Sequence, residues 1–226
     1  MKLVKFTAGS LLALLLSTLS PSAASAGIAI VDYVGFGWET DGLAASLPGD
    51  VFSVANVVTQ IDPRFGVNLG SAEATLYITG LTSQGAVTDP GTGVTTITYT
   101  GGTLAIYGDA SRNHDWGTNP ANGTVPSTFT DGSLVFSGTF TSFTLSLLPS
   151  GAGIYEGLLN GTGGSALAYP CSGCAYTFAG TFGAPTSAQI PAGYDVQVDG
   201  TLELEGAVPA ETMNWGSLKQ LFNPGR

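Results

Sequence analysis

The chain has 226 residues, a net charge of −10 and a charged fraction of only 10%. This acidity argues against nucleic acid and anionic membrane surfaces as partners, because both would repel the chain. Glycine contributes 33 residues and threonine is abundant, and both are poor helix formers. The composition is therefore typical of an extracellular β protein rather than of a helical one.

The first 26 residues have the pattern of a secretory signal peptide. Lys2 and Lys5 precede an apolar run at 11–16, and Ala-Ser-Ala at 24–26 is a small-residue cleavage site. We expect cleavage after Ala26 and a secreted or cell-surface product. The apolar run is shorter than the ~20 residues of a membrane span. No later stretch is long and apolar enough, so no transmembrane helix is expected after cleavage.

Residues 27–207 predict one all-β domain. At 139–147, for example, Phe143 and Leu145 alternate with Thr144 and Ser146, which is typical of a strand with one buried face. Turns rich in Gly, Pro and Asn separate such segments. Predicted strands cover 27–37, 51–60, 73–79, 94–99, 103–107, 134–136, 139–147, 153–159, 175–182 and 194–206. About ten short strands with Gly-rich turns predict antiparallel sheets packed face to face, as a β-sandwich or jelly roll.

A long polar loop is predicted at 109–130. Asp109, Ser111, Asn113 and Asp115 alternate in its first part. In an extended chain this spacing brings four oxygen-bearing side chains to one side, as Ca²⁺ requires. The alternative is a solvated loop in which Asp and Asn make turns with their own backbone. Calcium is the one cofactor that the sequence suggests.

Aromatic residues near predicted loops are candidates for ligand binding. Trp116 and Tyr107, together with Trp38, could stack on a sugar or could equally pack in the core. We therefore expect a structural or binding module, possible partners being a glycan or a cell-surface protein.

Enzymatic alternatives have weaker support. His114 is the only histidine, and no Gly-x-Ser-x-Gly motif frames a serine nucleophile. A secreted carbohydrate-active hydrolase is the first alternative, with its paired carboxylates drawn from Glu39, Asp41, Glu156, Glu203 and Glu205. A polar strand face explains Glu203 and Glu205 equally well. An outer-membrane β-barrel is a more distant alternative, because alternation and a high Thr and Gly content also fit one.

Cys171 and Cys174 are the only cysteines. In an exported chain this spacing favours a disulfide that closes a tight turn. A thioredoxin-type site would need a helix beginning at the first cysteine, whereas the residues that follow have the pattern of a strand.

Residues 208–226 form a tail of different character. Trp215, Leu218 and Phe222 recur at helical spacing, Thr212 can cap the segment, and Asn-Pro-Gly at 223–225 ends it. This predicts a short amphipathic helix of about three turns. We expect its apolar face either to dock on the domain or to be recognised as a sorting tail.

Several turn-like motifs lie between 101 and 206. They are Gly-Thr-Leu-Ala-Ile-Tyr at 102–107, Asp-Trp-Gly-Thr-Asn-Pro at 115–120, Phe-Thr-Asp-Gly at 129–132, and Gly-Tyr-Asp at 193–195 followed by Val-Asp-Gly at 198–200. In these motifs the chain resembles an uncharacterised exported β-rich bacterial family whose members often carry a PEP-CTERM sorting tail. Val-Pro at 208–209 also fits, but the ending is instead similar to short tails on other exported proteins. The resemblance implies export and brings no activity with it.

Overall fold

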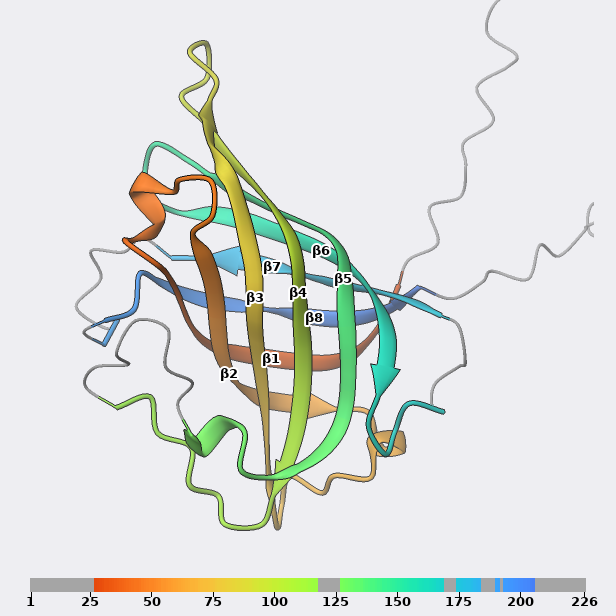
Figure 1. Cartoon of the computed structure of the whole chain (residues 1–226). Helices are drawn as coiled ribbons and strands as arrows, with labels where there is room; N and C mark the ends of the chain where they lie inside the picture. The colour runs from red at the N-terminus through yellow and green to blue at the C-terminus, as the bar shows by residue number, and fades with distance from the viewer. Residues whose placement is uncertain (1–26, 118–126, 169–173, 184–189, 192, 206–226) are drawn as a thin grey trace, which may run out of the picture.

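The computed structural model describes residues 27–117, 127–168, 174–183, 190–191 and 193–205. In these residues eight antiparallel strands follow one another around a closed barrel (Figure 1). The strands are β1 (Ile28–Glu39), β2 (Val51–Ile61), β3 (Glu73–Thr88), β4 (Thr95–Asp109), β5 (Ser133–Leu147), β6 (Gly153–Gly163), β7 (Ala175–Phe182) and β8 (Val196–Glu205). The 3-10 helices η1 (Leu43–Ala45), η2 (Pro63–Phe65) and η3 (Ser127–Phe129) lie in the connections.

The barrel closes because β1 pairs with both β2 and β8. The β1–β8 ladder runs from Ile28 opposite Leu204 to Gly37 opposite Val196. The prediction of an all-β antiparallel fold is confirmed, whereas the predicted sandwich or jelly roll is wrong. Alternation could not separate the two architectures, because each strand has one buried face in either of them.

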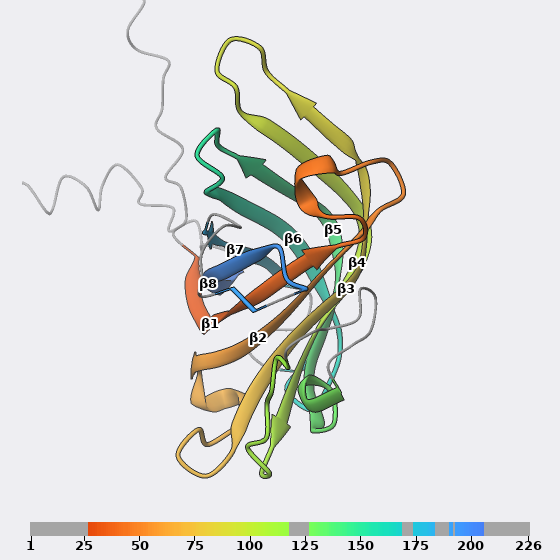
Figure 2. The same cartoon turned by 90° about the vertical axis from the view of Figure 1, so that its left-hand side faces the viewer.

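Strands β3 and β4 are longer than predicted and bend near their middle. Gly80, Gly101 and Gly102 have φ angles of 76°, 70° and 87°, in the left-handed region that favours glycine. The register also shifts within this pair, between Ser83 and Ala86. Glycine and irregular pairing let a strand curve instead of ending. The segments predicted as separate strands at 94–99 and 103–107 are therefore one strand, and the β3–β4 hairpin projects from one end of the barrel (Figures 1 and 2).

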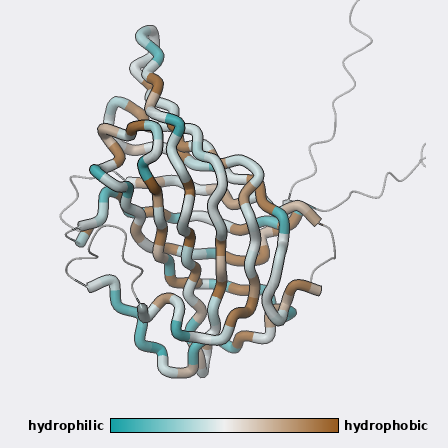
Figure 3. The backbone as a smooth tube through the Cα atoms, in the orientation of Figure 1, coloured by the Kyte–Doolittle hydropathy of each residue, from teal (hydrophilic) through white to brown (hydrophobic). Residues whose placement is uncertain are grey.

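The interior of the barrel is filled by apolar side chains, many of them aromatic. Tyr33 stacks on Phe178 with ring centroids 4.6 Å apart, and Phe143 stacks on Tyr155 at 6.2 Å. Figure 3 shows hydrophobic and hydrophilic residues alternating along the strands. Burying each such ring contributes about 2–3 kcal/mol, so this core is the main source of the barrel's stability.

A second apolar cluster lies apart from this core. It is centred on Trp38 of β1, Tyr77 of β3 and the loop residues Phe129 and Tyr194, all of them buried. Trp38 and Tyr194 meet edge to face with centroids 5.3 Å apart. The connections between β4 and β5 and between β7 and β8 therefore cover one outer wall of the barrel.

Three predictions fall outside the described residues. They are the signal peptide at 1–26, the disulfide, of which Cys171 is not described, and the tail helix that carries Trp215, Leu218 and Phe222. Cys174 is described and packs, partly buried, against the interior core. In the part of the chain that the structure covers, no helix has the length and apolar character needed to span a membrane.

Candidate functional site

The polar loop after β4 is tied to the barrel by Glu73, the first residue of β3. Its Oε1 accepts hydrogen bonds from the backbone N–H groups of Asn113 and His114, at 2.8 and 2.9 Å. Its Oε2 lies 2.5 Å from Nδ1 of His114. Hydrogen bonds to an ionised carboxylate are among the stronger ones, and Glu73 is buried, so this contact fixes the course of the loop.

The four residues predicted to bind calcium lie along this anchored loop. Asp109 Oδ1 accepts from the N–H of Ser111 at 2.9 Å, and Asp115 Oδ1 accepts from the N–H two residues later at 2.8 Å. These are turns of Asp with its own backbone, the alternative that the sequence left open. Asn113 is held through its backbone by Glu73. In the described ranges no group of three or more His, Cys, Asp or Glu residues could hold a metal, and calcium binding at Asp109–Asp115 stays a prediction.

Trp116, a predicted ligand-binding residue, is engaged in packing. Its Nε1 donates to the carbonyl oxygen of Ala55 on β2 at 3.0 Å, and Tyr194 Oη donates to its backbone oxygen at 2.9 Å. Its ring meets Phe36 edge to face at 5.2 Å. The second candidate, Tyr107, lies half-buried on β4 opposite Leu134. Trp116 thus packs the loop after β4 against the outer face of β1 and β2.

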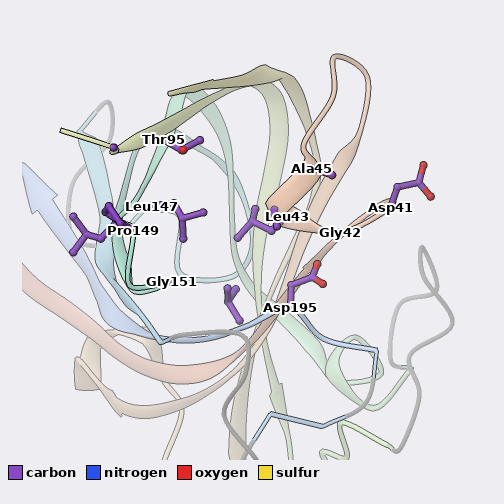
Figure 4. Close-up of a pocket in the computed structure, with 13 residues that line it drawn as sticks. Asp41, Gly42, Leu43, Ala45, Thr95, Leu147, Pro149, Gly151 and Asp195 are labelled. Carbon is purple, nitrogen blue, oxygen red and sulfur yellow. The ribbon is translucent and has the colours of Figure 1, made fainter. Parts of the chain in front are cut away.

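A pocket lies elsewhere, at the end of the barrel that carries η1 (Figure 4). This pocket has a volume of about 370 Å³. It is bounded by η1, the start of β4 with Gly93 before it, the end of β5 with the turn after it, and the beginning of β8. Its apolar lining includes Leu43, Ala45, Leu147, Pro149 and Val196. We refer to it as the end pocket.

Two carboxylates, those of Asp41 and Asp195, border the end pocket. Asp195 lies within the group of lining residues in Figure 4, whereas Asp41 lies at its edge and its carboxylate points away from the others. Asp41 has a φ angle of 63°, in the left-handed region of the turn that leads into η1. The charge in the pocket therefore comes mainly from Asp195, with Asp41 at the rim.

Asp195 is held in place by the end of β1. Its backbone N–H donates to the oxygen of Gly37 at 2.9 Å, and its Oδ2 accepts from the N–H of Glu39 at 2.8 Å. Burial raises the pKa of Asp195 above its ordinary value, although hydrogen bonds from the N–H groups of Glu39 and Leu43 act in the opposite direction. The carboxylate is thus fixed in position, and its N–H donors do not fully replace the hydration that it loses on burial.

Beneath η1 lies a buried polar network centred on Glu39, which is only 1% exposed. Ser46 Oγ donates to its Oε1 at 2.6 Å, and Tyr99 Oη donates to its Oε2 at 3.0 Å. Ser46 Oγ also lies 2.7 Å from Ser83 Oγ. Burial raises the pKa of Glu39 to about 7, and the two hydroxyl donors only partly offset that rise. The network links β1, β3, β4 and the residue that ends η1.

The remaining candidate carboxylates do not join this group. Glu156 is exposed in β6. Glu203 and Glu205 share one face of β8, where they accept hydrogen bonds from Thr201 and Thr177 at 3.2 and 2.6 Å. A polar strand face, the simpler interpretation of Glu203 and Glu205, therefore describes them.

Sequence reasoning overlooked Asp195 as a site residue and considered Glu39 and Asp41 only as hydrolase carboxylates. The available signal was weak, because Asp195 is separated from Asp41 by 154 positions and only barrel closure brings β8 beside β1. No protein-family model, curated protein or solved structure matches the chain. Nothing in these comparisons or in the described side chains indicates an enzymatic activity.

Proposed function

We propose that the protein is an exported binding module that holds a small, mostly apolar molecule in the end pocket. The observation that carries this proposal is the hollow of about 370 Å³ between η1, the β5–β6 turn and β8, with its apolar lining. Small-molecule sites commonly occupy 300–1,000 Å³, and the mouth of a β-barrel is one of their frequent locations. The export rests on the signal-peptide pattern at 1–26.

The packing of the barrel supports the mouth rather than the interior as the binding site. Eight-stranded barrels are either filled by side chains or hold one small ligand. Here Tyr33, Phe143 and Phe178 fill the centre and are at most 1% exposed. The end pocket lies outside this core, where η1 and the neighbouring turns meet.

The other proposals have less support. A glycan stacked on Trp116 would have to compete with the contacts of that ring to Phe36 and the hydrogen bond to Ala55. A lipid-facing barrel is expected to be apolar outside and polar inside. Strands β4 and β5 have the reverse order, with Leu104 and Phe140 buried and Thr98 and Thr139 exposed.

A pocket-filling variant tests the proposal. Ala45 is exposed on η1 and lines the pocket, so Ala45→Trp should reduce the space without disturbing a strand. The matched control is Ala175→Trp, an exposed alanine at the start of β7. Ligand-detected NMR with amines, alcohols and acids that carry one cyclohexyl ring should show binding to the wild type and to Ala175→Trp, with affinity reduced about tenfold or more in Ala45→Trp. Equal binding to all three proteins, or binding to none, would refute the end pocket as the site.

A further inference from the structure

We infer that the ligand of the end pocket carries a protonated amine beside a small apolar group, and that the carboxylate of Asp195 is its counter-ion. This inference rests on the proposed function and names the chemical class that the same site would select. It follows from three features of the pocket: its charges are negative, the carboxylate of Asp195 lies on its wall, and the hydrogen bonds to that carboxylate do not offset its burial.

The charges around the end pocket are all negative. Asp195 and Asp41 line it, and no described residue of the lining is basic. Glu39 lies behind η1, and the negative charges of Asp50 and Asp195 are close enough to raise its pKa further. A cleft with apolar walls and one sign of charge attracts ligands of the opposite sign. An anionic ligand would be repelled, and a neutral one would leave the carboxylates without a counter-ion.

Asp195 is the residue best placed to receive the cation. The N–H of Glu39 is 2.8 Å from its Oδ2, so the carboxylate is held in a fixed position on the pocket wall. Neutral N–H donors do not compensate the loss of hydration fully, since burial still raises the pKa of this group. A partly buried carboxylate gains most from a charge-assisted hydrogen bond, and an ammonium group offers up to three donors.

The rest of the pocket limits the size and polarity of the ligand. Leu43, Leu147 and Val196 present aliphatic side chains, which favour burial of a hydrocarbon group. A volume of about 370 Å³ lies near the lower end of the range of small-molecule pockets, so one ring or a short chain fits better than a larger molecule. Together these features define an apolar amine of small size.

A series of three matched compounds tests the inference: cyclohexylmethylamine, cyclohexylmethanol and cyclohexanecarboxylate, titrated at neutral pH. We expect the amine to bind at least about tenfold more tightly than the alcohol, and the carboxylate to bind most weakly. The affinity for the amine should fall as the salt concentration rises, while that for the alcohol should not, because only the charge pair is screened.

Two substitutions assign the effect to the pocket. Asp195→Asn keeps an oxygen to accept from Glu39 and removes the charge, and the affinity for the amine should fall about tenfold. Asp41→Asn changes the rim charge alone, because asparagine tolerates a positive φ, and a smaller loss of about two- to threefold is expected. Glu156→Gln removes an equal charge from exposed β6 and should change nothing.

The outcomes separate this inference from the proposed function. If amine and alcohol bind equally well and Ala45→Trp weakens both, the binding module stands and the charge selection is overturned. If the amine binds but Asp195→Asn and Asp41→Asn leave its affinity unchanged, the inference is overturned as well. If none of the three compounds binds, the proposed function and this inference both fail.

Discussion

The hydroxyl groups of Tyr33 and Tyr155 lie 3.0 Å apart in the barrel interior, although 122 residues separate them in the chain. Tyr155 also donates to the backbone oxygen of Asp199 at 3.2 Å. The space for these hydroxyl groups is left by a glycine pair, Gly180 opposite Gly200 in the β7–β8 ladder. A Cβ atom at Gly200 would lie 2.6 Å from Tyr155 Oη and 2.3 Å from the oxygen of Ala179.

This arrangement predicts that two substitutions lower the free energy of unfolding by different amounts. Tyr155→Phe removes one hydroxyl group and should lower the free energy of unfolding by about 1 kcal/mol. Gly200→Ala should cost more, about 2 kcal/mol or above, because the added carbon meets backbone that cannot rotate away. Urea unfolding measures both changes. The reverse order, with Gly200→Ala the milder change, would contradict the close approach of β7 and β8.

Glu39 predicts a pH dependence of stability. Its folded-state pKa of about 7 exceeds the ordinary 4.5, so the folded protein binds more protons than the unfolded chain between these values. Stability should therefore be highest below pH 4.5 as far as this group is concerned, fall as the pH rises towards 7, and then level off. The total effect is at most about 3 kcal/mol. Glu39→Gln, which cannot ionise, should reduce this slope and be more stable than the wild type at pH 8.

The measurement for Glu39 is thermal or urea unfolding between pH 5 and pH 8. Burial also raises the pKa of Asp195, so any slope that this group contributes has the same sign and is retained in Glu39→Gln. The matched control is Glu156→Gln on the exposed face of β6, which should keep the full slope. An unchanged slope in Glu39→Gln would show that Glu39 is ionised throughout this range.

Removal of the Glu73 side chain should release the polar loop. Glu73→Ala leaves the backbone N–H groups of Asn113 and His114 without their acceptor, and we expect a loss of about 2–3 kcal/mol. Amide exchange at 110–117 should accelerate, while the barrel strands stay protected. Asp131→Ala is the control, because it removes an exposed contact to the same loop and should cost well under 1 kcal/mol. Slow exchange in Glu73→Ala would mean that other contacts suffice to anchor the loop.

Deletion of residues 211–226 should leave the barrel folded. The eighth strand ends at Glu205, so the deletion removes no strand of the closed sheet. We expect circular dichroism to show the same β content and a midpoint of thermal unfolding within a few degrees of the full chain. Retention at the cell surface is the second measurement, since it tests whether Trp215, Leu218 and Phe222 act as a sorting tail. A truncated protein that fails to fold would place the tail in the core.

The fold could be predicted from the sequence as far as local patterns reach. Alternating segments and β-branched apolar segments together predicted a strand within each of the eight observed strands. Closure could not be predicted, since it depends on Ile28 meeting Leu204, and no local pattern records that pairing. Gly101 and Gly102 lie between the predicted strands 94–99 and 103–107, where a turn was expected, although their positive φ angles only bend β4.

The candidate site was less predictable for a related reason. The loop residues Asp109 and Asp115 stand close together in the sequence, which predicted a shared cation site, yet their carboxylates accept hydrogen bonds from neighbouring backbone N–H groups. Asp195 carries the charge of the end pocket, but its partners on η1 and β1 come from the other end of the chain. A site that forms where β1 meets β8 combines residues from opposite ends of the chain, so the spacing of residues in the sequence does not reveal it.

Because β1 pairs with β8, the chain could begin and end at another connection without changing the pairing of the strands. Because each strand touches its two neighbours around an unbroken ring, a circular permutant that joins β8 to β1 through a short linker retains all eight ladders. New ends can be opened at 89–92, in the hairpin tip that projects from the barrel (Figure 2), because Gly93 and Thr95 line the end pocket. In such a permutant Asp195, β8, β1 and η1 would lie in one continuous segment, so these parts of the end pocket would be close together in the chain as well as in space.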